Sequence, residues 1–277
     1  MSKYNRARTL RSIRRATLMA MAVSNPAWAH DPVFGLGPHT LFKDGVEVHV
    51  GYFREQAGDA REQEYGLALK YGITADWTVG IEAPFLDLTE PGASRSGRGD
   101  LALSTKYRFW RNDLPGAQEA TAVSLGLVLG GSGDDEVDND GSTDAILGLS
   151  YGYEGRKWYR WAAVRYRLNG ENDQGLRRGN KLLIDLVGGI RPRPYTYYEP
   201  DWVWMLELNG ELTERVELNG QRLSNTGGDQ WFLSPGLMWT YRNYAIKTGV
   251  QFPIVQDLNG TQDEVDYRFT LEFEGHF

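Results

Sequence analysis

The chain has 277 residues, a formal net charge of −7 and no cysteine. This acidic balance, without a basic stripe, argues against a nucleic-acid partner, and the lack of cysteine excludes a disulfide framework or a thiolate metal site. No apolar run approaches the roughly 18 residues of a transmembrane helix, but a transmembrane β-barrel stays open, because alternation hides its strands from hydropathy averages.

The first 29 residues have the order of a secretory signal peptide. Basic residues and no acid precede the apolar stretch ATLMAMAV, and the small-x-small site Ala27-Trp28-Ala29 follows. This order predicts cleavage after Ala29 and a mature chain that begins at His30. The alternative is an amphipathic N-terminal helix of the mature fold.

Residues 30–44 contain Gly and Pro and lack alternation, so we expect a periplasmic segment or a plug in the barrel lumen. His30, His39 and His49 lie close together in sequence, and an N-terminal histidine can chelate copper through its amine and imidazole. The simpler interpretation is that these histidines fall together by coincidence in a periplasmic or lumen-filling segment. The sequence therefore predicts no metal site and no cofactor.

From residue 46 onward the chain settles into period-two alternation, which is typical of strands with one apolar and one polar face. The expected strands are 46–53, 64–73, 77–85, 100–110, 121–131, 145–153, 161–168, 181–190, 202–212, 231–239, 244–252 and 267–277. An even number of strands without helices predicts an all-β fold, a transmembrane antiparallel up-and-down β-barrel of about 12 strands over residues 45–277.

Parity assigns the two faces of each strand. Apolar side chains such as Leu67, Leu69 and Ile81 share the face that we expect to contact lipid. Charged side chains share the other face, which we expect to line the lumen. These lumen-lining residues are Glu47, His49, Glu64, Lys70, Glu82, Lys106, Arg108, Arg165, Arg167, Lys181, Asp185, Arg191, Glu207, Arg242, Lys247, Arg268 and Glu272.

The connections separate a barrel from a two-sheet sandwich, which would also alternate. Long connections such as REQAGDAREQ and GSGDDEVDNDGST recur at one end, and the other end has tight turns at 74–76 and 242–243. Outer-membrane barrels have long external loops and short periplasmic turns. We therefore expect both termini to be periplasmic.

Aromatic residues gather beside the short connections, as expected for a girdle at one membrane interface. This girdle comprises Trp77, Trp110, Trp158, Trp161, Trp202, Trp204, Trp239 and the terminal Phe277. The alternating last strand, ending in Phe, also resembles the signal that the outer-membrane assembly machinery reads.

Two stretches, YGITADWTVGIEAPF (71–85) and GDLALSTKYRFW (99–110), resemble the MetA-pathway of phenol degradation family of outer-membrane proteins. The resemblance implies a porin-like barrel linked to the uptake of small compounds.

We therefore expect an outer-membrane channel or facilitator for small solutes, small organic compounds among them, and not an enzyme. Its expected partners are outer-membrane lipid, lipopolysaccharide, the assembly machinery and the solutes. A non-conducting structural or metal-associated barrel and an outer-membrane hydrolase remain as alternatives. The acidic loop 133–141 fails the helix-loop-helix calcium pattern, because its twelfth position is Leu147.

Overall fold

The structure is a computed structural model that describes residues 31–131, 137, 141–193 and 199–277. Every regular element in these ranges is a strand. None of the described residues belongs to a helix long and apolar enough to cross a membrane. The predicted signal peptide 1–29 lies outside the described residues.

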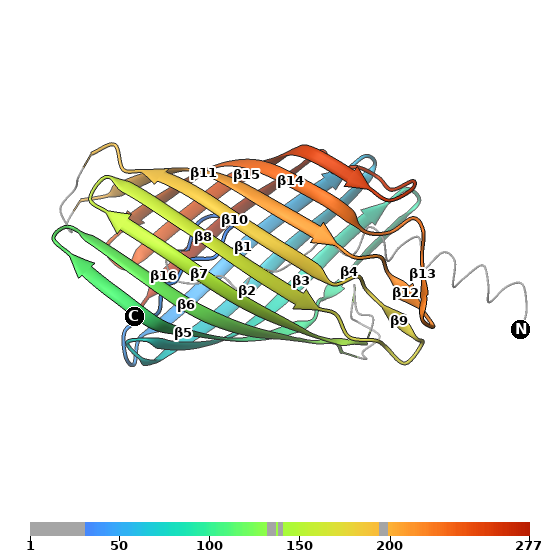
Figure 1. Ribbon diagram of the computed structural model, residues 1–277, viewed down its shortest axis with the longest axis horizontal. Coiled ribbons are helices and arrows are strands. Elements are labelled where there is room, and N and C mark those ends of the chain that lie inside the picture. Colours follow the sequence, from blue (N-terminus) through green and yellow to red (C-terminus); the bar gives the residue numbers. More distant parts are fainter. Residues whose placement is uncertain (1–30, 132–136, 138–140, 194–198) are drawn as a thin grey trace, which may run out of the picture.

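The strands form a closed antiparallel barrel of 12 strands, which confirms the predicted fold (Figure 1). The barrel strands are β1 (Val46–Ala57), β2 (Ala60–Thr74), β3 (Trp77–Glu90), β5 (Leu101–Leu114), β6 (Ala117–Leu129), β7 (Thr143–Gly155), β8 (Trp158–Leu168), β10 (Lys181–Ile190), β11 (Asp201–Thr213), β14 (Gly228–Tyr241), β15 (Tyr244–Leu258) and β16 (Tyr267–His276). Each strand pairs with its neighbour in the chain, and β1 pairs with β16, which closes the ring.

Four short strands lie at one end of the barrel. The strand β4 (Ala93–Arg98) pairs with residues 85–90 of β3. Earlier along β3, residues 77–82 pair with β5 on the same edge. The other three, β9 (Leu176–Arg177), β12 (Glu217–Leu218) and β13 (Gln221–Arg222), form a small sheet of their own. We call this the long-loop end, and the opposite end, which holds the C-terminus, the short-turn end.

One predicted long loop is instead a strand hairpin. The stretch REQAGDAREQ continues β1 and β2, whose pairing extends to Ala57 opposite Ala60. Gly58 adopts a φ of 55° in the tight turn between them, which a residue without Cβ tolerates well. Alternation continues through the hairpin, because Glu55, Glu62 and Glu64 are all buried. The charged residues of this stretch therefore line the inner face of two strands that are longer than predicted.

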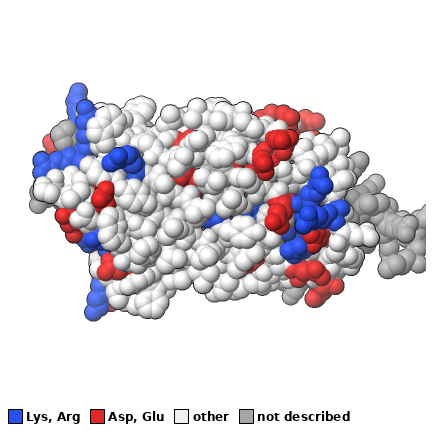
Figure 2. Space-filling model, viewed as in Figure 1, with Lys and Arg blue, Asp and Glu red and all other residues white. Residues whose placement is uncertain are grey.

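The outer surface of the barrel is apolar around its middle. In β2 the burial pattern alternates strictly, and the outward side chains Leu67 and Leu69 are 58% and 50% exposed. Figure 2 shows charged residues gathered toward the two ends of one face, with a largely uncharged band between them. An apolar band with charged rims is the surface that a membrane-spanning barrel presents to lipid.

Most of the predicted girdle aromatics lie on the outer surface. Trp77, Trp110, Trp158, Trp202, Trp204 and Phe277 are exposed, and Trp239 is half-buried. Phe277 also helps to close the ring, because its N–H donates to Val46 O and its carbonyl accepts from Val46 N, both at 2.8 Å.

Trp161 corrects the predicted girdle. It is 3% exposed and points into the barrel, where its Nε1 donates to Glu154 at 2.9 Å and its ring stacks on Tyr159. The reason is parity: Trp158 and Trp161 are three residues apart on one strand, so their side chains leave opposite faces. Nearness to a short turn predicted the end of the barrel correctly but not the face.

Replacing Leu69 by arginine tests the assignment of the outer face. Arginine facing lipid at the bilayer midplane of a barrel costs about 2–4 kcal/mol, and less near the interfaces. We expect Leu69→Arg to lower the folded fraction in liposomes well below that of Leu69→Ala, measured by gel mobility with and without boiling. Equal losses for the two variants would contradict a lipid-facing position.

Candidate functional site within the barrel

The N-terminal segment lies inside the barrel. Asp31, Val33, Phe34, Leu36 and Leu41 are each 6% exposed or less, and the segment can be followed within the ring of strands in Figure 1. We call residues 31–41 the plug segment. Its apolar contacts are with strand ends near the short turns, so it fills that half of the interior.

Glu207 on β11 holds the first part of the plug segment. Its carboxylate accepts hydrogen bonds from the backbone N–H groups of Val33, Phe34 and Gly35, at 2.7, 3.2 and 2.9 Å. Glu207 is fully buried. Three donors converging on one carboxylate satisfy backbone groups that would otherwise be buried without partners.

Lys106 on β5 holds the middle of the plug segment. Its ammonium group donates to both carboxylate oxygens of Asp31, at 3.2 and 3.1 Å, and to Gly37 O at 2.8 Å. Ser150 Oγ donates to the same carbonyl at 3.1 Å, and Gly37 N donates to Asp31 at 2.9 Å. Nearer the turns, Leu41 N donates to Thr78 Oγ1 at 2.9 Å. Polar contacts from several strands thus fix the segment.

Glycines on the inner face make room for the plug segment. A Cβ on Gly152 would lie 2.8 Å from Pro38, and one on Gly236 or Gly249 would lie 2.8 Å from Val33 or Phe34, respectively. Contacts this close would force backbone or side-chain shifts. The wall of the barrel is therefore shaped to the segment.

A small apolar core joins the plug segment to the wall. Its members are Val33, Phe34, Tyr159, Trp161, Val187, Val203, Met205 and Met238. Burying such side chains stabilises by about 1.5–3 kcal/mol each. Packing and the polar contacts therefore both favour the docked segment.

Replacing Glu207 by glutamine should weaken the docking of the plug segment. The amide keeps one acceptor oxygen but turns an NH₂ group toward backbone donors, so at least one charge-assisted hydrogen bond is lost, worth about 1.5–3 kcal/mol. We expect faster proteolysis within residues 31–41 in Glu207→Gln, in folded protein. Glu119→Gln, on a half-buried carboxylate that accepts from Tyr151, serves as the control and should leave proteolysis unchanged.

Nearly all of the predicted lumen-lining residues lie on the inner face. Those that are buried there are Glu47, His49, Glu64, Lys70, Glu82, Lys106, Arg108, Arg165, Arg167, Lys181, Asp185, Glu207, Lys247 and Arg268. Glu272 is half-buried beside them. Arg191 is half-buried just past the end of β10 and pairs with Asp201 at 2.6 Å.

Arg242 departs from the prediction. It lies in the two-residue turn between β14 and β15, is exposed, and adopts a φ of 54°. The alternation of inward and outward side chains along β14 ends at Tyr241, because a tight hairpin turn reverses the chain at Arg242. Arg242 therefore does not face the interior.

The buried charges form ion pairs across neighbouring strands. Lys70 pairs with Glu47 at 2.6 Å, and Arg165 pairs with Asp185 at 2.7 Å. Other pairs use further carboxylates, of which Glu211 also has the inner parity of β11 and the rest lie outside the predicted set. These pairs are Arg167–Asp144 at 2.6 Å, Arg268–Glu55 and Arg268–Glu211 at 2.6 Å, Lys247–Glu274 at 2.7 Å and Lys106–Asp31 at 3.1 Å.

Parity along the strands could have predicted most of the carboxylates that the sequence analysis missed. Glu274 shares the parity of Glu272, and Asp144 and Glu55 continue the parity of strands that run longer than expected. Asp31 had none, because a segment without periodicity does not reveal which strand its side chains meet.

Between the plug segment and the long-loop end lies a cavity of about 80 Å³. Val33 and Phe34 of the plug segment form part of its wall. The polar part of its lining is His49, Glu64, Glu82, Arg165, Asp185, Asn209, Glu211, Gln251, Arg268, Thr270 and Glu272. The interior thus holds solvent space bounded by charged side chains of both signs.

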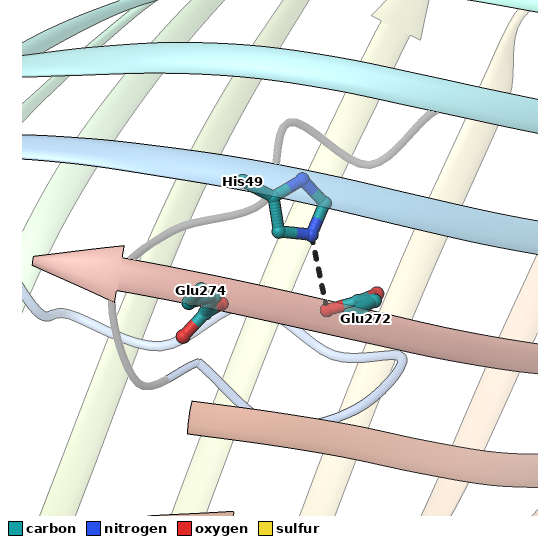
Figure 3. A group of neighbouring side chains, drawn as sticks. All are labelled: His49, Glu272 and Glu274. Atoms are coloured by element: carbon teal, nitrogen blue, oxygen red, sulfur yellow. Dashed lines mark ion pairs between the residues drawn. The ribbon is translucent and has the colours of Figure 1, made fainter. Parts of the chain in front are cut away.

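The structure does not gather the histidines near the N-terminus into one site. His39 contacts Glu154, whereas the ring of His49 points toward Glu272 on β16, 3.5 Å from its carboxylate (Figure 3). His30 and most of the acidic loop 133–141 lie outside the described residues. His39 and His49 therefore do not come together as ligands of one copper ion.

Comparisons with known proteins agree with this architecture. A family model described as putative MetA-pathway of phenol degradation matches residues 71–252. No match was found among curated proteins.

Among solved structures, the COG4313 outer membrane channel from Pseudomonas putida F1 is similar, with a TM-score of 0.68 at 12% identity over 87% of this chain and 98% of that one. The NanC porin has a TM-score of 0.51 at 13% identity, over 83% of this chain and 98% of that one. The first is described as an outer membrane channel and the second as a porin. At these identities the likeness shows the fold, that of an outer-membrane barrel.

Proposed function

Since the chain belongs to the family described as putative MetA-pathway of phenol degradation, we propose that it is an outer-membrane channel for small solutes. In this proposal the plug segment closes or narrows the path. Small organic compounds are the solute class that the family description favours. The barrel spans the outer membrane after export with a signal peptide cleaved behind Ala29.

The observation that carries this proposal is a segment docked inside a closed barrel rather than a continuous packed core. The plug segment fills the short-turn half through hydrogen bonds, the ion pair of Asp31 with Lys106 and a small apolar core. Beyond it lies the cavity lined by charged and polar side chains. A barrel of 12 strands is wider than the eight-stranded kind that side chains alone can fill.

The interior charges favour weak ionic selectivity. Acids and bases alternate around the wall and neutralise one another in pairs, as for Lys70 with Glu47 and Arg165 with Asp185. A pore with crossed fields of this kind rejects neither ion sign strongly and admits small neutral polar solutes.

The proposed partners follow from the two ends of the barrel. Lipid would cover the apolar band, and lipopolysaccharide would border the long-loop end. The assembly machinery would bind the last strand, β16, which ends beside the exposed Phe277.

Swelling of proteoliposomes tests the solute channel. Liposomes that contain the folded protein should swell in isosmotic solutions of small neutral solutes, with rates that fall as solute size grows. Lack of swelling in parent protein and in a variant without residues 31–41, both folded by gel mobility, would reject the proposal. Ester or lipid hydrolysis by such a silent barrel would favour the hydrolase alternative.

A further inference from the structure

A groove of about 700 Å³ lies on the outer surface of the barrel, near the short-turn end. It crosses β7, β8, β10 and β11, which lie side by side in the wall (Figure 1). The side chains that border it belong to Tyr153, Trp158, Arg160, Ile190, Trp204 and Leu206. We call it the outer groove. Trp158, Trp204 and Leu206 are 57%, 58% and 52% exposed, so the groove opens toward the surroundings of the barrel rather than toward its interior.

Gly188 on β10 forms the floor of the outer groove. It pairs with Arg160 on one side and with Leu206 on the other, so these two side chains flank it. Parity places the missing side chain on the outer face, because Leu186 is 49% exposed and Val187 between them is 6% exposed. A Cβ on Gly188 would meet no atom of the described residues within 4 Å. The groove is therefore a gap in the apolar outer surface.

Two tryptophans border the outer groove on the side of the short turns. Ile190 pairs with Trp158 and with Trp204, so the three side chains form one row across neighbouring strands. Tryptophan favours the level of the lipid headgroups, where its ring is half in apolar surroundings. Leu186 and Leu206 continue the surface toward the middle of the barrel. The groove therefore runs from headgroup level into the apolar band.

Two cations accompany the outer groove at headgroup level. The guanidinium carbon of Arg160 lies 4.4 Å from the ring centre of Tyr153, and Nζ of Lys157 lies 5.6 Å from the ring centre of Trp158. Both side chains are exposed. Neither forms an ion pair within 4.0 Å with a carboxylate of the described residues. An uncompensated positive charge thus stands on each side of the Trp158 ring.

The carboxylate in the same row of the wall is used elsewhere. Glu119 on β6 pairs with Tyr153, one strand away from Arg160. Its carboxylate accepts hydrogen bonds from Tyr151 at 2.9 Å and from Asn112 at 3.4 Å. A cation on the lipid-facing surface of a barrel is unfavourable unless it reaches the interface. An anion supplied by the membrane itself would complement Arg160 there.

From this geometry we propose that the outer groove binds one anionic glycerophospholipid of the surrounding membrane. Its phosphate accepts hydrogen bonds from Arg160, because a planar guanidinium matches phosphate oxygens, and Lys157 adds a second positive charge. One acyl chain lies over Gly188, between Leu206 and the aliphatic stem of Arg160. Since we expect the short-turn end to be periplasmic, the lipid comes from the periplasmic leaflet. The site binds its lipid whether or not the barrel conducts.

Native mass spectrometry of the folded full chain in detergent tests the site. Phosphatidylglycerol and phosphatidylcholine with identical acyl chains serve as the probes. We expect the parent protein to retain one phosphatidylglycerol at concentrations at which it retains no phosphatidylcholine. Inorganic phosphate at the same concentration should not displace the lipid, because it lacks the chains that fill the groove. Arg160→Gln should raise the Kd for phosphatidylglycerol by at least about tenfold, since a charge-assisted hydrogen bond is lost.

Gly188→Leu separates the groove from its charges. The substitution leaves Arg160 and Lys157 in place, and the open space above Gly188 accommodates the new side chain. It should raise the Kd for phosphatidylglycerol by a similar factor, because the leucine takes the place of the acyl chain.

Arg242→Gln is the matched control. Arg242 is also exposed at the short-turn end, with its guanidinium carbon 5.2 Å from the ring centre of Tyr241, but it does not line the outer groove. Its substitution should leave the Kd for phosphatidylglycerol unchanged. A loss in Arg242→Gln equal to that in Arg160→Gln would mean that any interfacial arginine suffices, which overturns a defined site.

Gel mobility before and after boiling verifies that each variant is folded. Phosphatidylglycerol should raise the temperature at which the folded band of the parent protein disappears, and raise it less in Arg160→Gln and Gly188→Leu. Equal lipid retention by the parent protein and both variants would overturn the proposal, as would equal retention of phosphatidylcholine or a preference for lipopolysaccharide. Dimers that Gly188→Leu abolishes, without any lipid preference, would assign the groove to a second copy of the chain. None of these outcomes bears on conduction.

Discussion

Replacing Lys106 by methionine is expected to release the plug segment from the barrel interior. The side chain of Lys106 is fully buried, and it is the cation that pairs with Asp31, which is 2% exposed. Removing it leaves a buried carboxylate without its ion-pair partner and Gly37 O without its ammonium donor. Breaking a buried ion pair from one side costs roughly 3–5 kcal/mol, which corresponds to at least about a hundredfold shift toward the undocked segment.

The absence of cysteine from the chain provides a clean measurement of this release. Val33 is 5% exposed inside the barrel, so a thiol introduced by Val33→Cys should react slowly with a maleimide that cannot enter lipid. Adding Lys106→Met should accelerate the reaction by about the same hundredfold factor.

The double substitution Lys106→Met with Asp31→Asn should recover much of the protection, because no buried charge is then left unpaired. Equal labelling rates with and without Lys106→Met, in protein that is folded by gel mobility, would mean that Lys106 does not hold the segment.

Replacing Arg165 and Arg167 together by glutamine is expected to shift ion preference toward cations and to lower stability. Arg165 pairs with Asp185 and Arg167 with Asp144, and all four side chains are buried. The substitutions leave two interior carboxylates unbalanced, at a cost of roughly 3–5 kcal/mol for each broken pair. The interior field then attracts cations more strongly.

Two measurements follow from this change. Reversal potentials across a salt gradient should move toward the cation value, and the urea midpoint for unfolding should fall. Adding Asp144→Asn and Asp185→Asn should return the reversal potential close to that of the parent protein, because the charge is balanced again. An unchanged urea midpoint in the variant that lacks both arginines would show that these two ion pairs do not stabilise the folded barrel.

The alternation of apolar and polar residues along the strands predicted most of the fold. Because side chains of one strand leave opposite faces in turn, Lys70, Glu82 and Asp185 could be placed on the inner face before any contact was known. The same rule predicts an inward side chain for Trp161, because Trp161 and the outward Trp158 have opposite parity on β8. Nearness to a short turn predicted the wrong face. Arg242 lay beyond the rule, since a tight turn interrupts the period.

The plug segment shows where sequence reasoning ends. Its Gly and Pro content predicted irregular structure, and a place in the lumen was one of two expected outcomes. Its partners Glu207 and Lys106 follow from no spacing, because Glu207 lies more than 170 positions along the chain from Val33. Glycines at 148 and 152 on the inner parity of β7 were a weak signal that something packs closely there.

Planar-bilayer recording tests the central claim, that the plug segment closes a solute channel, most directly. The folded full chain is compared with a variant that lacks residues 31–41, which keeps every barrel strand because β1 begins at Val46. We predict small or rare conductance steps for the full chain and larger, longer-lived steps for the variant. Steps of equal size and frequency in the two proteins, or silence in both after folding is verified by gel mobility, would contradict the account.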